Sequence, residues 1–369
     1  MDPAHPGGPS GSSGPRGHPG PAPWERAVPA DEPVLVWGAG AMGASIGARL
    51  HLAGRRVLLV DVDQAHVQAI VRRGLAITGP VETLQADVPA CTPGDLAGSA
   101  SPPFRVILLA VKAHHTPVAL DGLEPHLAND GFVVSVQNGL NERVIAARVG
   151  SARTIGCFVN FGADVVEPGV VLRGNRGAVV VGELDGALGD RIRWVHRLFQ
   201  EFEPDAVLTP NIWGYLWGKL AYGALLFATA LTDAPIAEVL GSGPHRPALI
   251  ALAREVMAVA EAEGIHPEPF DGFDPRAFAP GGVDRDAVAS LDRLVSFNRA
   301  SAKSHSGVWR DLAVRRRKTE VDAQIAPIAE IGSRLGVDVP LVRRLVDLVR
   351  DVESGRRPQA WETLDALVG

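Results

Sequence analysis

The chain has 369 residues, 46% of them hydrophobic, and a formal net charge of −6 at pH 7. Two domains are expected, because a single hydrophobic core stops growing near roughly 250 to 300 residues. Acidic and basic residues are mixed without long runs of one sign, which argues against nucleic acid or a membrane surface as partner and favours a small-molecule ligand.

Residues 1–31 form the first predicted segment. They are rich in Pro, Gly and Ser and contain no continuous apolar stretch. Such a segment buries too little apolar surface to fold, and it lacks the apolar region of a secretory signal. We therefore expect a disordered tail ahead of the folded domains.

Short apolar strands alternate with helices from Pro33 onward. The run VLVWGAG predicts a strand that ends in a tight turn, and AMGASIGARLHLAG predicts the helix after it. Further strands are expected in RVLLVDVD, FRVILLAVKA and GFVVSVQNG, with a helix in QAHVQAIVRRG. This alternation is typical of an α/β fold with a parallel sheet covered on both faces. Three strand-like pieces between Thr154 and Gly182 are expected to extend the sheet edge in antiparallel fashion.

The second half of the chain has helical spacing. Helices are expected over residues 213–240, 247–263, 286–301 and 319–335. We place a boundary between residues 206 and 209, so that an α/β domain covers residues 32–207 and an all-helical domain covers residues 208–369. Apolar faces in LALAREVMAVAEAEG and IAPIAEIGSRLG fit either a deep core or a homodimer contact through the helical domain, and a core is the commoner reason for such faces.

The longest apolar stretch is interrupted by Lys219, Asp233 and Glu238, so no membrane-spanning helix is expected. The two cysteines, Cys91 and Cys157, belong to no cluster with metal-ligand spacing. This cysteine content argues against a disulfide framework and against a metal site, and it favours a cytoplasmic protein.

A glycine motif joins the first strand to the first helix. It reads Gly38-Ala39-Gly40-Ala41-Met42-Gly43, a GxGxxG pattern. The first glycine permits the tight turn, the second lets backbone amides approach a pyrophosphate, and the third permits close packing of the helix. We therefore expect a dinucleotide here, with Ala41 and Met42 at the helix N-terminus that faces the phosphates. A glycine turn without a ligand is the alternative, and the flanking strand and helix argue against it.

Asp61 ends the second strand, 18 residues after Gly43. A carboxylate at this place accepts hydrogen bonds from the adenosine ribose hydroxyls and repels a 2′-phosphate, so it favours NAD over NADP. Asp63 adds to the repulsion. Arg72 and Arg73 on the following helix could serve a 2′-phosphate, although arginines on an exposed helix face are commonly only solvated. NAD is the predicted cofactor, with NADP less favoured.

Four further stretches complete a recognisable set: LLAVKAHHT, SVQNGLNE, LWGKLAYGALL and RRKTEVDAQ. In this order, after the glycine motif, they resemble the ketopantoate reductase (2-dehydropantoate 2-reductase) family from about Pro33 to Val339. The resemblance implies an N-terminal Rossmann-type doubly wound domain and a C-terminal helical domain like that of 6-phosphogluconate dehydrogenase, with the active site between them. It also implies reduction of a 2-oxo acid with NADPH.

The resemblance implies roles for individual residues. Lys219 matches the family's catalytic acid, and Glu320 matches the glutamate that contacts the reacting substrate. Lys112 and Asn138 match positions that line the cofactor and substrate cleft, and Val111 beside Lys112 is included in the predicted cofactor site.

Two adjacent histidines lie near the same predicted sheet edge. His114 and His115 are candidates for a general acid, but the resemblance gives that task to Lys219, so we expect both at the rim. Cys157 and Asn160 could also approach the cleft, although a place in the strand core is the simpler interpretation.

The sequence departs from the family pattern in the predicted substrate pocket. Where the family usually has three asparagines after the catalytic lysine, this chain has Gly223, Phe227 and, at about the third position, Ala237. These replacements predict a more apolar pocket than ketopantoate requires. A second departure is Asp61, which stands where the family usually has a basic residue.

A third departure lies in KSHSGVWRDL, ahead of the predicted glutamate. Ser306 and Arg310, together with His305 and Trp309, could form a different substrate clamp, because the planar guanidinium of arginine suits a carboxylate. The alternative is structural, with Ser306 capping a helix and Trp309 packed in the core.

Lys219 is the one charged residue in LWGKLAYGALLF. Hydride transfer to a carbonyl carbon leaves negative charge on the oxygen, which a positioned ammonium group stabilises and protonates. In the reverse direction a neutral lysine takes the alcohol proton, which requires burial to lower its pKa. A carboxylate is expected nearby to offset that burial, and Glu320 is the candidate. The alternative is that Lys219 reaches the surface with only its stem buried.

These features predict an enzyme: a nicotinamide-dependent oxidoreductase that transfers a hydride between NAD(P)H and a small 2-oxo or 2-hydroxy acid or related carbonyl compound. Lys219 would be its general acid or base. Two alternatives stay open, a true NADPH-dependent ketopantoate reductase and a non-catalytic dinucleotide sensor whose helical domain serves a partner. The presence of both Lys219 and Glu320 argues against the sensor.

Overall fold

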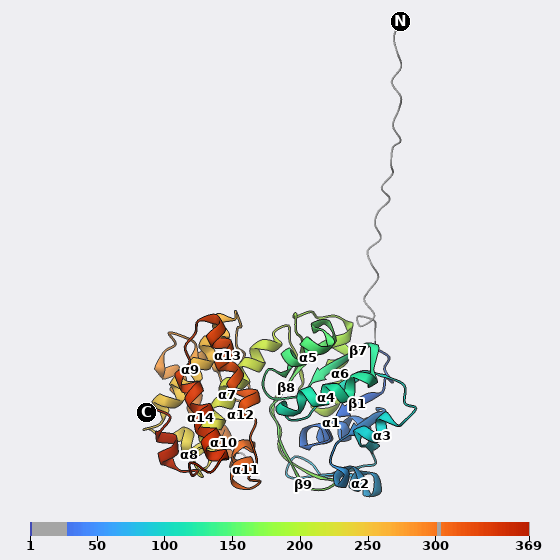
Figure 1. Cartoon of the computed structure of the whole chain (residues 1–369), viewed down its shortest axis with the longest axis horizontal. Coiled ribbons are helices and arrows are strands. Elements are labelled where there is room, and N and C mark those ends of the chain that lie inside the picture. The colour runs from blue at the N-terminus through green and yellow to red at the C-terminus, as the bar shows by residue number, and fades with distance from the viewer. Residues whose placement is uncertain (2–27, 301–303, 369) are drawn as a thin grey trace.

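The computed structural model of the chain describes residue 1 and residues 28–300 and 304–368. The tail predicted over residues 1–31 falls mainly outside these ranges. Its last residues belong to the folded domain, because Val28 packs in the core of that domain and Trp194 donates a hydrogen bond to the Pro29 carbonyl at 3.0 Å. The chain forms two lobes side by side, one built around a sheet and one built of helices (Figure 1).

The first lobe contains an eight-stranded sheet of order β12-β11-β8-β7-β6-β1-β2-β5. All neighbouring strands are parallel except β11, which is antiparallel to β8. The strands are β1 (Val34–Trp37), β2 (Val57–Val60), β5 (Ala90–Cys91), β6 (Phe104–Leu109), β7 (Leu127–Ser135), β8 (Thr154–Val159), β11 (Val179–Glu183) and β12 (Val207–Leu208).

Helices cover both faces of this sheet, and β1 shows why. Side chains alternate between the faces of a strand. Val34 and Val36 pack in one core with helices α1 (Ala41–Leu52) and α6 (Asp190–Phe202). Leu35 and Trp37 pack in a second core with the three helices of the other face, which are α3 (Pro93–Ala97), α4 (Thr116–Leu123) and α5 (Asn141–Val149). Helix α2 (Gln64–Arg73) follows β2. The predicted doubly wound α/β fold is confirmed.

The prediction of three antiparallel additions to the sheet edge holds only for β11. Strand β8 instead continues the parallel order beside β7. Strands β9 (Gly162–Glu167) and β10 (Val170–Asn175) leave the main sheet and form a second one, of order β4-β3-β10-β9, with β3 (Leu75–Thr78) and β4 (Leu84–Ala86). The parallel pairing of β10 with β3 joins segments far apart in the sequence, which local patterns do not reveal.

The second lobe is helical after β12. Its helices are α7 (Ile212–Thr229), α8 (Ile236–Gly241), α9 (Arg246–Ala262), α10 (Asp284–Ala300), α11 (Gly307–Ala313), α12 (Val321–Gln324), α13 (Ala326–Leu335), α14 (Pro340–Glu353) and α15 (Trp361–Asp365). The segment predicted as one helix over residues 213–240 is two helices, because Pro235 cannot lie within a continuous helix. No described helix is long and apolar enough to cross a bilayer.

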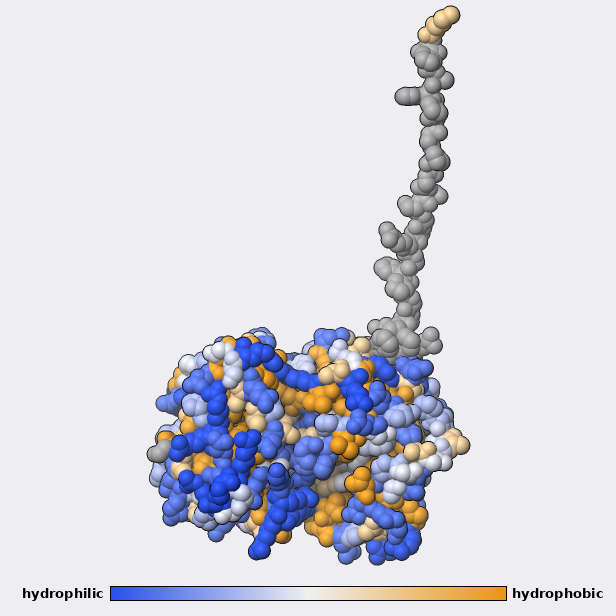
Figure 2. Space-filling model, in the orientation of Figure 1, coloured by the Kyte–Doolittle hydropathy of each residue, from blue (hydrophilic) through white to orange (hydrophobic). Residues whose placement is uncertain are grey.

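Helix α7 lies at the centre of this lobe and packs against α9 and α14. The apolar residues of α9, including Leu249, Leu252, Val256 and Val259, are buried in this core within a single chain. A core role therefore accounts for the apolar face of α9, and the homodimer stays a prediction. The surface is mostly hydrophilic, with apolar patches near the boundary of the two lobes (Figure 2).

Candidate active site

The glycine turn after β1 has the backbone geometry that the motif predicts. Gly38 has φ +105°, and a Cβ atom there would lie 2.8 Å from the backbone carbon of Ala110. A Cβ on Gly43 would lie 2.0 Å from the Gly38 carbonyl oxygen, so this position brings the helix against the turn. A Cβ on Gly40 would have no atom within 4 Å, and the residue faces the pocket.

The N-terminus of α1 opens onto the same space. Its N-cap, Gly40, has no side chain to occupy the first amides, and Ala41 and Met42 line the pocket. Free amides at a helix N-terminus attract an anion. A narrow turn, open space at Gly40 and uncapped amides together fit a dinucleotide pyrophosphate.

Asp61 and Asp63 have different surroundings. Asp61 lines the pocket beyond β2, and its Oδ1 accepts a hydrogen bond of 2.9 Å from the Asp63 amide. Asp63 caps α2 by accepting hydrogen bonds from the amides of Ala65 and His66. Arg72 and Arg73 are exposed at the other end of α2 and do not line the pocket. Among the predicted residues at this end of the pocket, only Asp61 is charged.

A pocket of about 660 Å³ lies between the two lobes. Most of the predicted site residues line it, namely Gly38, Gly40, Ala41, Met42, Asp61, Val111, Lys112, Asn138, Lys219, Ser306 and Glu320. Of the two histidines, His115 lines the pocket and His114 does not. Gly43 and Arg310 do not line it, and neither do His305 and Trp309, the other members of the predicted clamp.

One face of α7 forms a wall of the pocket. Lys219, Gly223, Leu226 and Phe227 all line it, at the spacing of residues on one side of a helix. A Cβ on Gly223 would have no atom within 4 Å, so this position is open space beside the lysine. Ala237, the third position of the predicted apolar set, packs against the helical core instead.

The Lys219 ammonium group is held at the inner end of this wall. Its Nζ donates a hydrogen bond to the Val159 carbonyl at the end of β8 and lies 5.1 Å from the centroid of the Phe158 ring. Burial lowers the pKa of Lys219 to about 8, while the charges of Asp271, Glu142 and Glu320 act in the opposite direction. Lys219 therefore gains or loses its proton within the neutral to mildly alkaline range.

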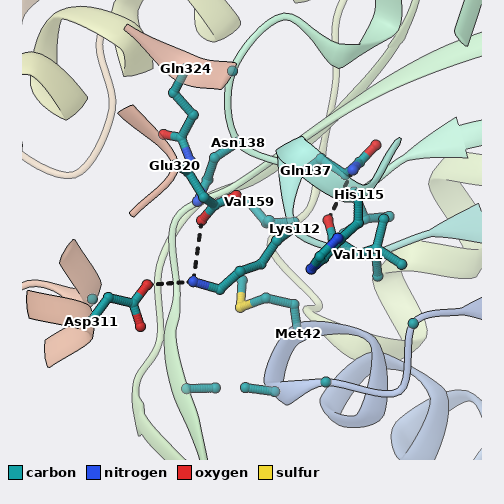
Figure 3. Close-up of a pocket in the computed structure, with 18 of the residues that line it drawn as sticks. Met42, Val111, Lys112, His115, Gln137, Asn138, Val159, Asp311, Glu320 and Gln324 are labelled. Carbon is teal, nitrogen blue, oxygen red and sulfur yellow. Dashed lines mark hydrogen bonds and ion pairs between the residues drawn. The ribbon is translucent and has the colours of Figure 1, made fainter. Parts of the chain in front are cut away.

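Glu320 pairs with a different lysine from the one predicted. Its Oε1 accepts a hydrogen bond of 2.7 Å from the Ala113 amide, and its Oε2 lies 3.8 Å from Lys112 Nζ. Lys112 also forms an ion pair with Asp311, and Figure 3 shows the lysine between the two carboxylates. Within the described ranges no ion pair joins Glu320 to Lys219. Glu320 stands at the start of α12, where its carboxylate contacts the loop that contains Lys112 and Ala113.

Asp311 was not predicted from the sequence. Its side chain is buried, and it pairs with Lys112, Arg315 and Arg317. Burial alone would raise the pKa of Asp311, but the hydrogen bond and charge of Lys112, with the nearby arginines, hold that pKa below its ordinary value. The carboxylate thus stays ionised and keeps the Lys112 ammonium in place between the lobes.

The structure agrees with the structural alternative for Ser306 and gives Arg310 a partner that was not predicted. Ser306 is the N-cap of α11, where its Oγ accepts a hydrogen bond of 3.1 Å from the Trp309 amide, although it also lines the pocket. The Arg310 guanidinium forms an ion pair with Asp164 of β9 and joins the two lobes. Trp309 is only partly buried and contacts the His305 ring. The guanidinium group of Arg310, which was predicted to bind the substrate, is therefore already paired with the carboxylate of Asp164.

Several other pocket residues escaped the sequence analysis. Arg315 and Arg317 line the pocket, as do Asp164 and Gln324, whereas Asn160 was named only as a secondary candidate. The run of arginines ahead of Glu320 is visible in the sequence, but its proximity to Asp311 depends on how α11 ends. Gln137 is buried and donates hydrogen bonds to the Val111 carbonyl and Thr116 hydroxyl, which ties the Lys112 loop to β7.

In the part of the chain that the structure describes, no group of His, Cys, Asp and Glu side chains could hold a metal ion. Cys91 and Cys157 are free thiols.

Comparisons with known proteins agree on one family. Residues 34–186 match the family model of ketopantoate reductase PanE/ApbA, and residues 211–353 match the model of its C-terminal part. The chain is 27% identical over 345 residues to a 2-dehydropantoate 2-reductase of Mesorhizobium japonicum, which covers 86% of this chain and 96% of that protein. It is 28% identical over 323 residues to a 2-dehydropantoate 2-reductase of Archaeoglobus fulgidus, with 87% and 98% covered.

Solved structures share the fold. A ternary structure of D-mandelate dehydrogenase with NADH and anilino(oxo)acetate has a TM-score of 0.76 and 22% identity, and the match covers 88% of this chain and 98% of that one. A ketopantoate reductase of the PanE/ApbA family from Ralstonia eutropha has a TM-score of 0.72 and 25% identity, with 88% and 99% covered. The family models and the curated relatives confirm the predicted class of enzyme, an oxidoreductase that uses a nicotinamide dinucleotide. The chain belongs to the ketopantoate reductase PanE/ApbA family.

Proposed function

We propose that the chain catalyses the reversible reduction of a 2-oxo acid with an apolar body, using NADH. The α/β domain, residues 32–207, would bind the dinucleotide, and the helical domain, residues 208–369, would supply the substrate wall. The observation that carries the proposal is the place of Lys219, whose ammonium group lies in the same pocket as the glycine turn and beside the open, apolar space at Gly223.

The residues at the glycine turn fit a dinucleotide, which when bound would supply or accept the hydride. Gly40 and the amides at the start of α1 would hold the pyrophosphate. Asp61 would accept hydrogen bonds from the ribose hydroxyls. Its negative charge favours NAD over NADP. The neighbouring residues on the pocket wall, Val60, Val62 and Pro93, are uncharged.

Lys219 is the proposed acid and base. In the direction of reduction its ammonium group stabilises the negative charge that grows on the substrate oxygen and then donates a proton to it. In the direction of oxidation the neutral amine accepts the proton of the hydroxyl. A pKa of about 8 lets one side chain serve both directions near neutral pH.

The polar end of the pocket would orient the substrate. Asn138 is exposed on the pocket wall, and Glu320 and Lys112 lie beside it (Figure 3). We propose that Glu320 and Asn138 hydrogen-bond to the oxo acid, while the Lys112 ion pairs keep the lobes at the correct separation. The substrate carboxylate would meet Arg315 or Arg317, because these two arginines line the pocket and Arg310 does not. Both also pair with Asp311, which would hold them in position.

The apolar wall of α7 sets the proposed substrate class. Gly223, Leu226 and Phe227 offer no hydrogen bond from their side chains, so hydroxyl groups on the substrate body would lose their solvation without compensation. Of the relatives, the Mesorhizobium protein is named for ketopantoate, whereas the D-mandelate dehydrogenase structure holds anilino(oxo)acetate. The wall favours an oxo acid with an apolar or aromatic body.

A panel of 2-oxo acids tests the proposal, with aliphatic, aromatic and hydroxylated members and with NADH or NADPH as reductant. We expect turnover of the apolar acids with NADH, and its loss in Lys219→Ala. Preference for ketopantoate and NADPH would support the second candidate, an ordinary ketopantoate reductase, which the names of the curated relatives favour. Dinucleotide binding without turnover of any panel member would favour a sensor.

Two further predictions have no support beyond the sequence. A homodimer through the helical domain and a cytoplasmic location both stay predictions. Size-exclusion chromatography with light scattering would measure the oligomeric state directly.

A further inference from the structure

Glu142 is an acidic residue without access to solvent. It is the second residue of α5, and its side chain is 0% exposed. Within the described structure, neither carboxylate oxygen forms a hydrogen bond of regular geometry, although its own backbone amide and the Ser135 hydroxyl are near enough to lower its pKa. A buried carboxyl group with so few partners is costly to keep charged, and such groups are rare in protein cores. Glu142 takes no direct part in the proposed reaction.

Strand β8 connects the surroundings of Glu142 with those of the proposed catalytic lysine. Helices α5 and α7 both pack against β8, and its Cys157 is completely buried. The next two residues of β8, Phe158 and Val159, are those that contact the Lys219 ammonium group. Glu142 therefore lies on a helix that packs against the strand holding the lysine, and it does not line the pocket itself.

The three groups lie within electrostatic range of one another. The charge of Lys219 lowers the pKa of Glu142, and the charge of Glu142 raises the pKa of Lys219. Burial raises the pKa of Cys157 well above its ordinary value, with Glu142 acting in the same direction and Lys219 against it. The thiol is therefore neutral near pH 7.

We propose that Glu142 is a positioning residue for the proposed reaction, and that its buried carboxyl group sets how tightly Lys219 holds its proton. The inference rests on the proposed role of Lys219 as acid and base. Because Glu142 has no access to the pocket, it acts on the lysine through its charge and not on the substrate.

The opposite directions of the two pKa shifts give this arrangement its effect. Burial raises the pKa of Glu142 to about 7, and burial lowers the pKa of Lys219 to about 8. The two ionisations therefore fall in neighbouring pH ranges. A negative charge on Glu142 favours the ammonium form of Lys219 and extends it to higher pH.

Other charges also act on the pair. Asp271, in the loop after α9, and Glu320, before α12, act on Lys219. The Ser135 hydroxyl at the end of β7 and the charge of Arg143 on α5 act on Glu142. These groups are the same in the wild-type protein and in a Glu142 variant, so a comparison of the two isolates the effect of Glu142.

Nuclear magnetic resonance with lysine labelled at Cε and Nζ tests the inference without a substrate. The chain has only four lysines, Lys112, Lys219, Lys303 and Lys318, and Lys219→Arg identifies the resonance of interest. In the wild-type protein we expect the Lys219 resonance to titrate in two steps. In Glu142→Gln we expect one step, with the Lys219 pKa lower by roughly half a unit or more.

Glu255→Gln is a matched control. Glu255 is a half-buried carboxylate on α9 that accepts hydrogen bonds from the Leu341 and Val342 amides, and it is not among the groups that act on Lys219. Its substitution should leave the Lys219 titration unchanged. A single Lys219 step in the wild-type protein, or an unchanged Lys219 pKa in Glu142→Gln, overturns the inference.

The test stays decisive if Glu142→Gln does not fold, because the shape of the wild-type titration is then the deciding observation. Its outcome is also separate from that of the substrate panel. Coupled titration with no turnover of any oxo acid would refute the proposed function alone. Turnover with an uncoupled Lys219 would refute the role of Glu142 alone.

Discussion

Replacing Lys219 by alanine should remove the acid of the proposed reaction and leave the dinucleotide site intact. A pKa of about 8 means that about nine-tenths of the enzyme carries the ammonium form at pH 7, and about one-tenth at pH 9. In the wild-type protein, kcat/KM for reduction should therefore fall about tenfold per pH unit above pH 8. For oxidation it should rise up to about pH 8 and then level.

Lys219→Ala should lower kcat/KM by roughly 10² to 10⁴-fold and abolish the inflection near pH 8, because general acid catalysis and oxyanion stabilisation are both lost. The assay follows NADH absorbance between about pH 6 and pH 10, with NADH binding measured by fluorescence. Lys318→Ala is the control, since Lys318 is exposed and does not line the pocket. A retained inflection in Lys219→Ala, or equal loss of NADH binding and turnover, would refute the assignment.

Three other substitutions test the remaining parts of the site. Asp61→Ala should shift the ratio of kcat/KM for NADPH over NADH upward by roughly tenfold, since it removes the charge that repels a 2′-phosphate; an unchanged ratio contradicts this. Gly223→Asn should fill the open space on α7 and lower kcat/KM for apolar oxo acids by roughly tenfold relative to hydroxylated ones, and a uniform loss for all substrates speaks against a specificity role. Relative to the wild-type protein, Glu142→Gln should gain stability as the pH rises from 4.5 to about 7, and it should keep that gain at higher pH. The carboxyl pKa rises from 4.5 to about 7 on folding, so its stabilising contribution is complete below pH 4.5 and lost through pH 7, by up to about 3 kcal/mol. Urea unfolding at several pH values measures this, and a pH-independent difference would contradict it.

The glycine motif and Asp61 could be predicted because their geometry is local. A GxGxxG sequence between an apolar strand and a helix has few backbone solutions, and Gly38 adopts the positive φ that one of them requires. The pocket-lining face of α7 could also be predicted from the sequence, because helical periodicity alone places Lys219, Gly223 and Phe227 on one side of the helix. Such features follow from residues close together in the chain.

Ion pairs across the pocket could not be predicted in this way. Arg310 was expected to face the substrate, and Glu320 was expected to pair with Lys219. The structure gives Arg310 to Asp164 and Glu320 to Lys112. Each pair joins segments more than a hundred residues apart, so its partner depends on how the two lobes meet.

By itself the sequence determined the order of strands and helices, the dinucleotide turn and the type of group that could act as acid, since these depend on periodicity and on the conformational limits of individual residues. Only the tertiary structure decided which carboxylate meets which cation and that the β9–β10 hairpin pairs with β3. It also decided that the buried Glu142 and Lys219 lie on helices that pack against the same strand, β8. The reason is physical: charges and strand edges act on whatever lies nearest in space, and the packing of the whole chain sets those distances.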